Sequence, residues 1–394
     1  MTRPLMASVA MMRFYALVVI AEFVGVLPTY NAPVEIAAII HSYHASTSVA
    51  SVIVSAELLA SALAALLTAS IVRDDRATSL ALIPCAIGVL INFLSVFNWP
   101  VAGFVALRIV GGASCGVLYG LGCFWSARDQ RGVAAFAAGL AVSGTVMAFA
   151  VGYLLQSVYS RGFAGLYGPV ATFQLVSLLL LVGVLRRSPE LRPLNAAAQA
   201  DSDSRRNGLW TSAFILICAG TMAGGLQLIW SLCERLASVR GYETGTIGTI
   251  LSVSLGFMVL GSIAAVVVGT RYSVPLMCGL GLLVAAGATW VVGFSTTPLM
   301  FGFGLCACYF SSVFSMPMMI GTAGLRDATG RLATLAGGVC LVAGAIAPVF
   351  GGFAFDLLSP VAVTWIVLAI FIVGGTTAVA LVRPLRSAPA VPFA

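Results

Sequence analysis

Long apolar runs separated by short polar gaps follow one another along the whole chain. An α-helix rises about 1.5 Å per residue, so about twenty apolar residues cross the hydrocarbon core of a bilayer. We therefore expect an all-α, multi-pass membrane protein embedded in a lipid bilayer. The pattern predicts twelve spanning helices, over residues 12–31, 47–71, 77–97, 100–124, 132–156, 166–185, 209–233, 245–269, 274–294, 297–320, 332–355 and 360–382.

Composition supports this prediction and excludes an ordinary soluble protein. Hydrophobic residues make up 60% of the 394 residues and charged residues only 8%, with a mean hydropathy of +1.06. A soluble domain carries about 25% charged residues. The net charge is +7, and all 20 basic residues are Arg. These arginines lie in the polar gaps, where they orient a membrane protein, so we expect no binding of nucleic acid.

The positions of the arginines predict the orientation of the chain. If the N-terminus is cytoplasmic, sixteen of the twenty face the cytoplasm, and only Arg161, Arg235 and Arg240 face outward. Such a bias follows the rule that short cytoplasmic loops are rich in basic residues. The first apolar run follows Arg3 and Arg13 and is long enough to be a retained helix rather than a cleaved signal. We expect both termini in the cytoplasm and a bacterial-type inner (plasma) membrane.

One long polar stretch divides the predicted helices into two sets of six. Residues 186–208 contain Pro, Ser and Asp without an apolar period, which is typical of a cytoplasmic linker. The linker separates an N-terminal half, residues 1–185, from a C-terminal half, residues 209–394. The segments that begin at Arg131 and Arg331 match at a shift of 200 residues. This is the pattern of parallel repeats related by an axis along the membrane normal.

Several motifs resemble those of the major facilitator superfamily. The family loop between spans two and three reads roughly G-x-L-A-D-R-x-G-R, and residues 70–78 read SIVRDDRAT, with Asp74 in the acidic position. The fourth-span motif R-x-x-Q-G corresponds to RIVGG, which keeps Arg108 and Gly112. The antiporter signature of span five, G-P-x-x-G-G, corresponds to GTVMAF, which begins at Gly144 and lacks the proline, and a closer copy, APVFGG, lies in span eleven.

This resemblance implies the twelve-helix major facilitator fold and similarity to its drug/proton antiporter group. In the family, the acid of the loop between spans two and three pairs with Arg of neighbouring cytoplasmic loops and latches the outward-facing state. Asp74 with Arg128 or Arg131 is the corresponding set here, and membrane topology alone is an equal explanation for these charges. The conformational positions that we expect are therefore Asp74, Arg128, Arg131, Gly144, Gly344 and Pro348.

Three ionisable residues fall well inside predicted spans, where a charge costs about 2.5–3.5 kcal/mol on insertion scales. They are Glu22 near the middle of span one, Glu57 in span two and Arg108 in span four. Burial disfavours a charged carboxylate and a nearby Arg favours it, so changing surroundings can make an acid bind and release a proton. Glu22 is the leading candidate for this proton site, and Glu57 is the next. The alternative for each acid is a structural pair or hydrogen bond between helices.

The family resemblance supports this assignment and adds a role for Arg108. Antiporters of the superfamily often place an acid in span one in a similar "EF" context, and the Arg of span four is thought to couple proton and substrate movements. Two alternatives remain for Arg108: it binds an anionic substrate in bidentate fashion, or it forms a fixed salt bridge with Glu22 or Glu57.

The C-terminal half has no charge at mid-span, so we expect it to supply binding surface rather than proton chemistry. In the family fold, spans one, four, seven and ten line the cavity. An apolar, aromatic lining suits amphipathic or aromatic organic molecules, and ordinary helix packing is the alternative for each residue. The candidate substrate-binding residues are Tyr30, Tyr119, Met222, Gln227, Trp230, Tyr309, Phe310, Ser312 and Phe314.

Three further expectations concern the outer ends of the spans. TYNAP, residues 29–33, should loosen the end of span one. His41 and His44 should follow as solvated residues of the outer loop, with weak metal binding as the alternative. Glu234 and Arg235 should form a solvated pair at the end of span seven.

The sequence contains no nucleotide-binding P-loop, nucleophile–base pair or metal-ligand spacing, and its nine cysteines lie among apolar residues. We therefore predict no enzyme activity, no cofactor and no bound metal. The leading hypothesis is a monomeric, proton-coupled antiporter that exports small organic molecules by alternating access. One alternative is a proton symporter that takes up an organic anion, held by Arg108, or another small metabolite. A third is a membrane sensor or scaffold with the same fold.

Overall fold

The computed structural model describes residues 3–72, 77–126, 132–186, 205–268, 272–326 and 331–380, and within these ranges the regular elements are twelve α-helices. They are α1 (Arg3–Tyr43), α2 (Thr47–Ile71), α3 (Ala77–Leu94), α4 (Val101–Ser126), α5 (Gly132–Arg161), α6 (Phe163–Arg186), α7 (Arg205–Ser238), α8 (Thr244–Val268), α9 (Val274–Phe294), α10 (Pro298–Arg326), α11 (Arg331–Leu357) and α12 (Pro360–Ala380). The all-α prediction is confirmed, and each predicted span corresponds to one helix.

The first helix is longer than predicted. It continues through Pro28 and Pro33 to Tyr43, so residues 29–33 do not loosen it, and His41 lies in the helix rather than in a loop. Proline interrupts a helix in water because it removes a backbone donor, but neighbouring helices can satisfy the freed carbonyl inside a membrane protein. α7 does so here. The end of α1 therefore carries buried positions beyond the predicted span.

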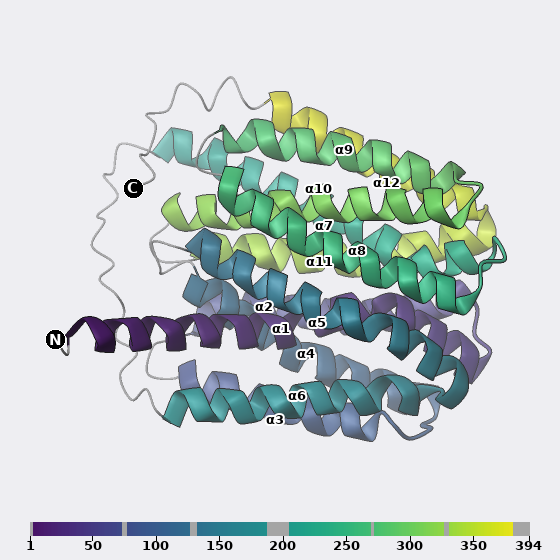
Figure 1. Ribbon diagram of the computed structural model, residues 1–394, viewed down its shortest axis with the longest axis horizontal. Coiled ribbons are helices and arrows are strands. Elements are labelled where there is room, and N and C mark those ends of the chain that lie inside the picture. Colours follow the sequence, from purple (N-terminus) through teal and green to yellow (C-terminus); the bar gives the residue numbers. More distant parts are fainter. Residues whose placement is uncertain are drawn as a thin grey trace.

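The helices lie roughly along one axis in alternating directions (Figure 1). We call the end at which α6 ends and α7 begins the linker end, and the end at which α1 and α7 finish the opposite end. The helices form the two six-helix halves of the predicted fold, α1–α6 and α7–α12. α2 packs against α11 and α5 packs against α8, so these two pairs join the halves.

Small residues allow the closest contact within the N-terminal half. Gly112 and Gly116 lie one turn apart on α4, and a Cβ at either position would overlap the backbone carbonyl of Glu57 or Ser61 on α2. Small residues at this spacing are a common means of close packing between spanning helices. Because Arg108 lies one turn before Gly112, this contact sets Arg108 beside Glu57.

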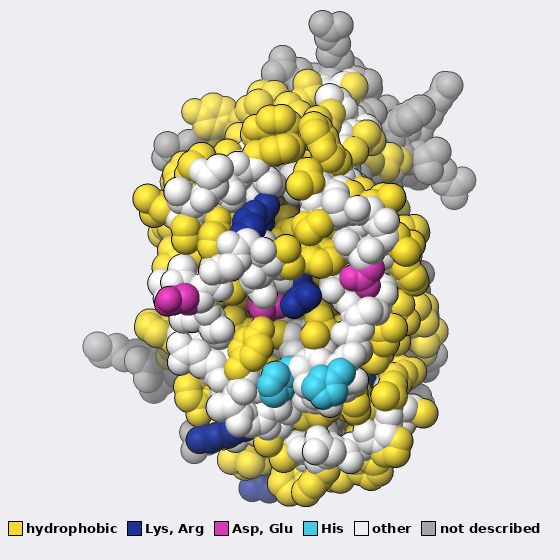
Figure 2. All heavy atoms as spheres, turned by 90° about the vertical axis from the view of Figure 1, so that its right-hand side faces the viewer, with side chains coloured by type: hydrophobic (Ala, Val, Ile, Leu, Met, Phe, Trp, Pro, Cys, Tyr) yellow, Lys and Arg dark blue, Asp and Glu magenta, His cyan; other side chains and the backbone are white. Residues whose placement is uncertain are grey.

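The surface of the described helices fits a membrane. Eleven of them are long and apolar enough to cross a bilayer, whereas the apolar run of α3, Leu80–Leu94, is shorter. Figure 2 shows the opposite end face-on, with the two histidines and several charged side chains among polar groups and with hydrophobic side chains along much of the margin. The chain is a multi-pass membrane protein. Its orientation stays a prediction.

Some predicted positions lie outside the described residues. They include Asp74, Arg128 and Arg131, which we expect to form a latch, and most of the predicted linker, residues 187–204.

Candidate functional site

A cavity of about 80 Å³ lies between the two halves, lined by α1, α2, α4 and α5 on one side and by α7, α8, α10 and α11 on the other. Its lining is mostly aromatic or aliphatic, includes three Met side chains, and among the described residues contains no acidic or basic side chain. Five of the predicted substrate-binding residues line it: Tyr30, Tyr119, Met222, Gln227 and Tyr309.

Three of the predicted substrate-binding residues on α10, Phe310, Ser312 and Phe314, do not line this cavity. Tyr309, Val313 and Met316 line it because they follow one face of the helix at i, i+4 and i+7. Successive residues of an α-helix are rotated by about 100° about its axis, so the residues between these three point in other directions. The prediction that these residues line the cavity is therefore wrong for all three. Phe310 is 36% exposed and lies against α8, Ser312 is buried outside the lining, and Phe314 faces α9.

Trp230 lies behind the cavity wall rather than in it. Its Nε1 donates a hydrogen bond to the backbone carbonyl of Tyr30, 3.2 Å away. The edge of its ring packs on Tyr309, with ring centroids 4.9 Å apart. Trp230 therefore contacts the backbone of Tyr30 in the N-terminal half and the ring of Tyr309 in its own half.

Glu22 is fully buried on α1, one turn before Val26, which lines the cavity. Its Oε1 accepts a hydrogen bond from the hydroxyl of Ser126 at 3.3 Å, and its Oε2 has no hydrogen-bond partner. It forms no ion pair with any residue that the structure describes. Gly122 and Gly139 make the slot that holds this side chain, because a Cβ at Gly139 would overlap the carboxylate.

Glu22 does not lie at the middle of the first span, as expected: the span reaches from Met12 to Tyr43, so Glu22 is nearer its beginning. Ser126 is the last residue of α4, and Gly139 is seven residues from the start of α5. Both helices have these ends at the linker end of the bundle. Glu22 therefore lies between the central cavity and the linker end. The sequence pattern placed it at mid-span because the predicted span ended at residue 31, whereas α1 continues to Tyr43.

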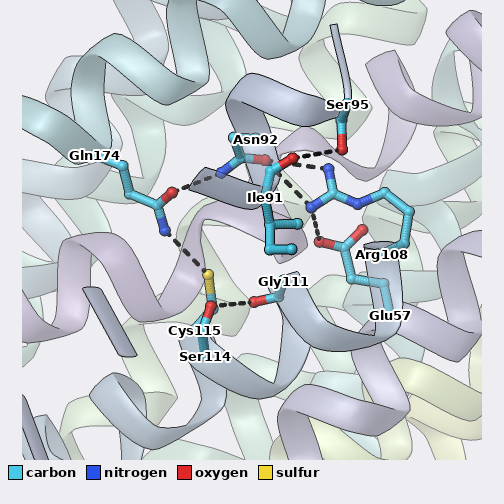
Figure 3. Close-up of polar contacts among 9 residues, drawn as sticks. All are labelled: Glu57, Ile91, Asn92, Ser95, Arg108, Gly111, Ser114, Cys115 and Gln174. Atoms are coloured by element: carbon cyan, nitrogen blue, oxygen red, sulfur yellow. Dashed lines mark hydrogen bonds and ion pairs between the residues drawn. The ribbon is translucent and has the colours of Figure 1, made fainter. Parts of the chain in front are cut away.

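Glu57 and Arg108 form a buried ion pair nearer the opposite end, with Glu57 Oε1 3.3 Å from Arg108 Nη2 (Figure 3). Nη1 and Nη2 of Arg108 also donate to Oδ1 of Asn92, at 3.1 and 3.2 Å. Nδ2 of Asn92 donates to Oε1 of Gln174 at 2.6 Å, and Nε2 of Gln174 donates to the sulfur of Cys115 at 3.5 Å. The network links α2, α3, α4 and α6, and Arg108 does not line the central cavity.

Two more residues complete this network. The guanidinium of Arg108 lies over the ring of Tyr167, 4.5 Å from its centroid. Glu35 of α1 lines the same small cavity of about 10 Å³ as Glu57 and Arg108. Sequence reasoning missed Glu35 because the predicted first span ended at residue 31. It missed Asn92 and Gln174 because an uncharged amide inside an apolar run gives no strong signal.

Glu234 is also buried, which corrects the expected solvated pair. Only 1% of its surface is exposed, and its Oε1 accepts a hydrogen bond from the hydroxyl of Tyr159 at 2.8 Å. The edge of the His41 ring packs on Tyr159, with centroids 5.7 Å apart. Since Tyr159 belongs to α5 and Glu234 to α7, this contact joins the two halves at the opposite end.

The described gating candidates lie where helices meet. A Cβ at Gly144 would overlap Met258, so Gly144 allows α5 to approach α8 of the other half. Gly344 lines the central cavity beside Gln227, and Pro348 lies one turn further along α11. These positions are compatible with a conformational role, which stays a prediction.

No protein-family model and no curated protein matches the sequence. Solved structures match the fold. The E. coli proton:xylose symporter XylE, bound to 6-bromo-6-deoxy-D-glucose, has a TM-score of 0.72 at 12% identity over 95% of this chain and 96% of that chain. The human organic anion transporter MFSD10 has 0.71 at 15% over 93% and 99%, and FucP in the outward conformation has 0.64 at 12% over 92% and 98%. This chain has the major facilitator fold. At these identities the likeness concerns the fold alone.

Proposed function

We propose that the protein is a proton-coupled secondary transporter that exports small organic molecules by alternating access. One observation supports this most strongly: a cavity shared by the two halves lies one helical turn from Glu22, a fully buried carboxylate. No described residue forms an ion pair with that carboxylate. A substrate site and a titratable group at such close range are what coupling needs.

The cavity lining favours aromatic or amphipathic substrates that are neutral or cationic. Tyr30, Tyr119 and Tyr309 supply ring faces, and aromatic faces attract both apolar groups and cations. Three Met side chains can adjust to different shapes because the unbranched thioether is flexible. Among the described lining residues Gln227 supplies an amide; its Nε2 already donates to Thr29 and Ser231, so its Oε1 is the atom that can accept a hydrogen bond from a bound molecule.

The proton step in this proposal belongs to Glu22. While the site is closed, burial without a cation favours the neutral carboxylic acid. When the halves open and water reaches the site, the carboxylate form becomes favourable and the proton leaves. Exchange follows if proton binding and substrate binding stabilise different states of the bundle.

The contacts between the halves suit such rocking motions. At the opposite end, Tyr159 donates to Glu234, and the backbone N–H of Ser48 donates to Asp356 at 2.7 Å. Each contact has one partner in each half and uses a hydrogen bond to a carboxylate, which can re-form with water when the halves separate. We propose that these contacts close the opposite end.

Uptake of an organic anion is less well supported. In that hypothesis Arg108 holds the substrate carboxylate, but Glu57 and Asn92 already occupy its terminal nitrogens and it lies outside the central cavity. Among the described residues, no basic side chain lines the cavity. Symport of a neutral molecule differs from export only in direction, which the following experiment determines.

The test uses proteoliposomes with an imposed pH gradient and two probes, ethidium as a permanent aromatic cation and chloramphenicol as a neutral aromatic molecule. An antiporter accumulates a probe in an acidic lumen, because protons leave as the probe enters. A protonophore should abolish this accumulation. Accumulation in an alkaline lumen instead would identify a symporter. Binding detected by tryptophan fluorescence without any flux would favour a sensor.

A further inference from the structure

Glu35 and Glu57 face one another inside the N-terminal half, about 20 Å along α1 from Glu22 at about 1.5 Å per residue. The exposed fraction is 2% for Glu35 and 4% for Glu57. Both side chains line the same small cavity, together with Arg108. Two ionised carboxylates cannot hydrogen-bond to each other, since both are acceptors only. A proton on one of them would supply the missing donor.

The charges around this pair lead to the same conclusion. Arg108 is the one cation that the described structure places in contact with it. Two carboxylates and one guanidinium would leave an uncompensated negative charge in a buried site, which is strongly unfavourable. A single added proton makes the group neutral.

No other group facing the pair can supply the missing positive charge. The titratable neighbours are Cys85 on α3, Cys115 on α4 and Tyr167 on α6, all of which are neutral at ordinary pH. On α11, which packs against α2, Cys340 lines the central cavity and Asp356 is bonded to Ser48. On α5 and α7, Tyr159 and Glu234 bond to each other.

The remaining carboxylate atoms are placed to bind a proton. Oε1 of Glu35 and Oε2 of Glu57 are buried and have no partner. Both residues line the cavity of about 10 Å³, which has room for about one water molecule. A water molecule in this space could hydrogen-bond to both carboxyl groups.

We propose that Glu35 and Glu57 share one proton, balanced by Arg108, and form a second proton-binding site separate from Glu22. A proton on either carboxyl group removes the repulsion between the two buried negative charges. A role of this site in transport rests on the proposed function. The protonation of Glu35 and Glu57 is independent of that function.

Infrared difference spectroscopy of the protein in lipid vesicles tests the inference. The C=O stretch of a protonated carboxyl group is measured in H₂O and D₂O for the wild type, Glu35→Gln and Glu57→Gln, each in a Glu22→Gln background. Either single substitution leaves one carboxylate beside Arg108, which balances it without a proton. Both variants should therefore lose the same protonated-carboxyl band. The matched control Glu243→Gln alters an exposed carboxylate and should keep it.

Loss of the band in only one variant would show that one acid holds the proton alone and would overturn the proposal. A band that changes when Na⁺ replaces choline at constant pH would overturn it in favour of a cation site. If a Gln variant does not fold, Glu35→Asp and Glu57→Asp should each shift the band rather than remove it, and an unshifted band in both would contradict the pair. Paired loss of the band, together with no pH-driven flux by the protein that retains Glu22, would remove the proposed function and leave this inference standing.

Discussion

Nε2 of Gln227 on α7 donates a hydrogen bond to the backbone carbonyl of Thr29 on α1, at 3.2 Å. In an α-helix that carbonyl accepts from the N–H four residues ahead, but here that residue is Pro33, which has none. Gln227 therefore supplies the missing donor, and its amide also contacts the hydroxyl of Ser231 at 3.1 Å. Pro33 in the N-terminal half thus leaves a backbone carbonyl without its helical donor, and Gln227 in the C-terminal half hydrogen-bonds to it beside the central cavity.

Replacing Gln227 by Leu should leave the Thr29 carbonyl without a partner and lower the free energy of unfolding by about 1–3 kcal/mol. Pro33→Ala restores a backbone N–H to the same carbonyl. In the Pro33→Ala background, the loss caused by Gln227→Leu should therefore be smaller. Thermal unfolding of the four proteins measures this coupling. Equal losses in both backgrounds would show that Pro33 does not create the acceptor.

Gly139→Ala should disturb the slot that holds Glu22, because the new methyl group overlaps its carboxylate. Overpacking of this kind lowers stability by about 1–3 kcal/mol. It should also reduce pH-driven flux of the probes. Gly183→Ala is the matched control, since nothing lies within 4 Å of a Cβ at that position. If both variants unfold at the wild-type temperature, the slot is not tight.

Tyr309→Ala should weaken probe binding about tenfold or more, which corresponds to about 1.4 kcal/mol for an aromatic residue that contacts the ligand. Phe310→Ala removes a ring of similar size from the neighbouring position, which lies outside the cavity. Its effect on affinity should stay within about twofold. Equilibrium binding of ethidium measures both. A larger effect at Phe310 would place the binding site elsewhere.

Arg108→Leu should destabilise the protein by about 3–5 kcal/mol, because it leaves buried acid without its cation. Adding Glu57→Gln removes one carboxylate and should recover a large part of that loss. Thermal unfolding again provides the measurement. A double variant that is less stable than Arg108→Leu alone would mean that Glu57 has another partner that matters more than Arg108.

The sequence alone allowed prediction of the fold because membrane spans leave a strong signal. Each apolar run of about twenty residues forms a helix. Most of the predicted linker lies outside the described residues, so its boundaries stay a prediction. The end of α1 could not be placed, because Pro28 and Pro33 normally end a helix in water. Only the packing of α7 against α1 shows how the carbonyl of Thr29 is satisfied.

The site was only partly predictable, for reasons of geometry. Glu22, Glu57 and Arg108 were identified because charge inside a span is rare. The sequence left open whether Glu22 or Glu57 pairs with Arg108, and the structure pairs Glu57. Tyr309 and Phe310 are adjacent aromatic residues, and only the rotation of α10 decides which of them reaches the cavity.

The most direct test of the account is probe accumulation in proteoliposomes that contain Glu22→Gln, with Glu243→Gln as the control. Gln keeps the size and hydrogen-bonding capacity of the side chain but cannot release a proton. The variant should fold, bind ethidium and exchange it between the two sides of the membrane, yet show no accumulation driven by the pH gradient. The control should accumulate ethidium like the wild type. Full pH-driven accumulation by Glu22→Gln would contradict the central claim that Glu22 carries the proton.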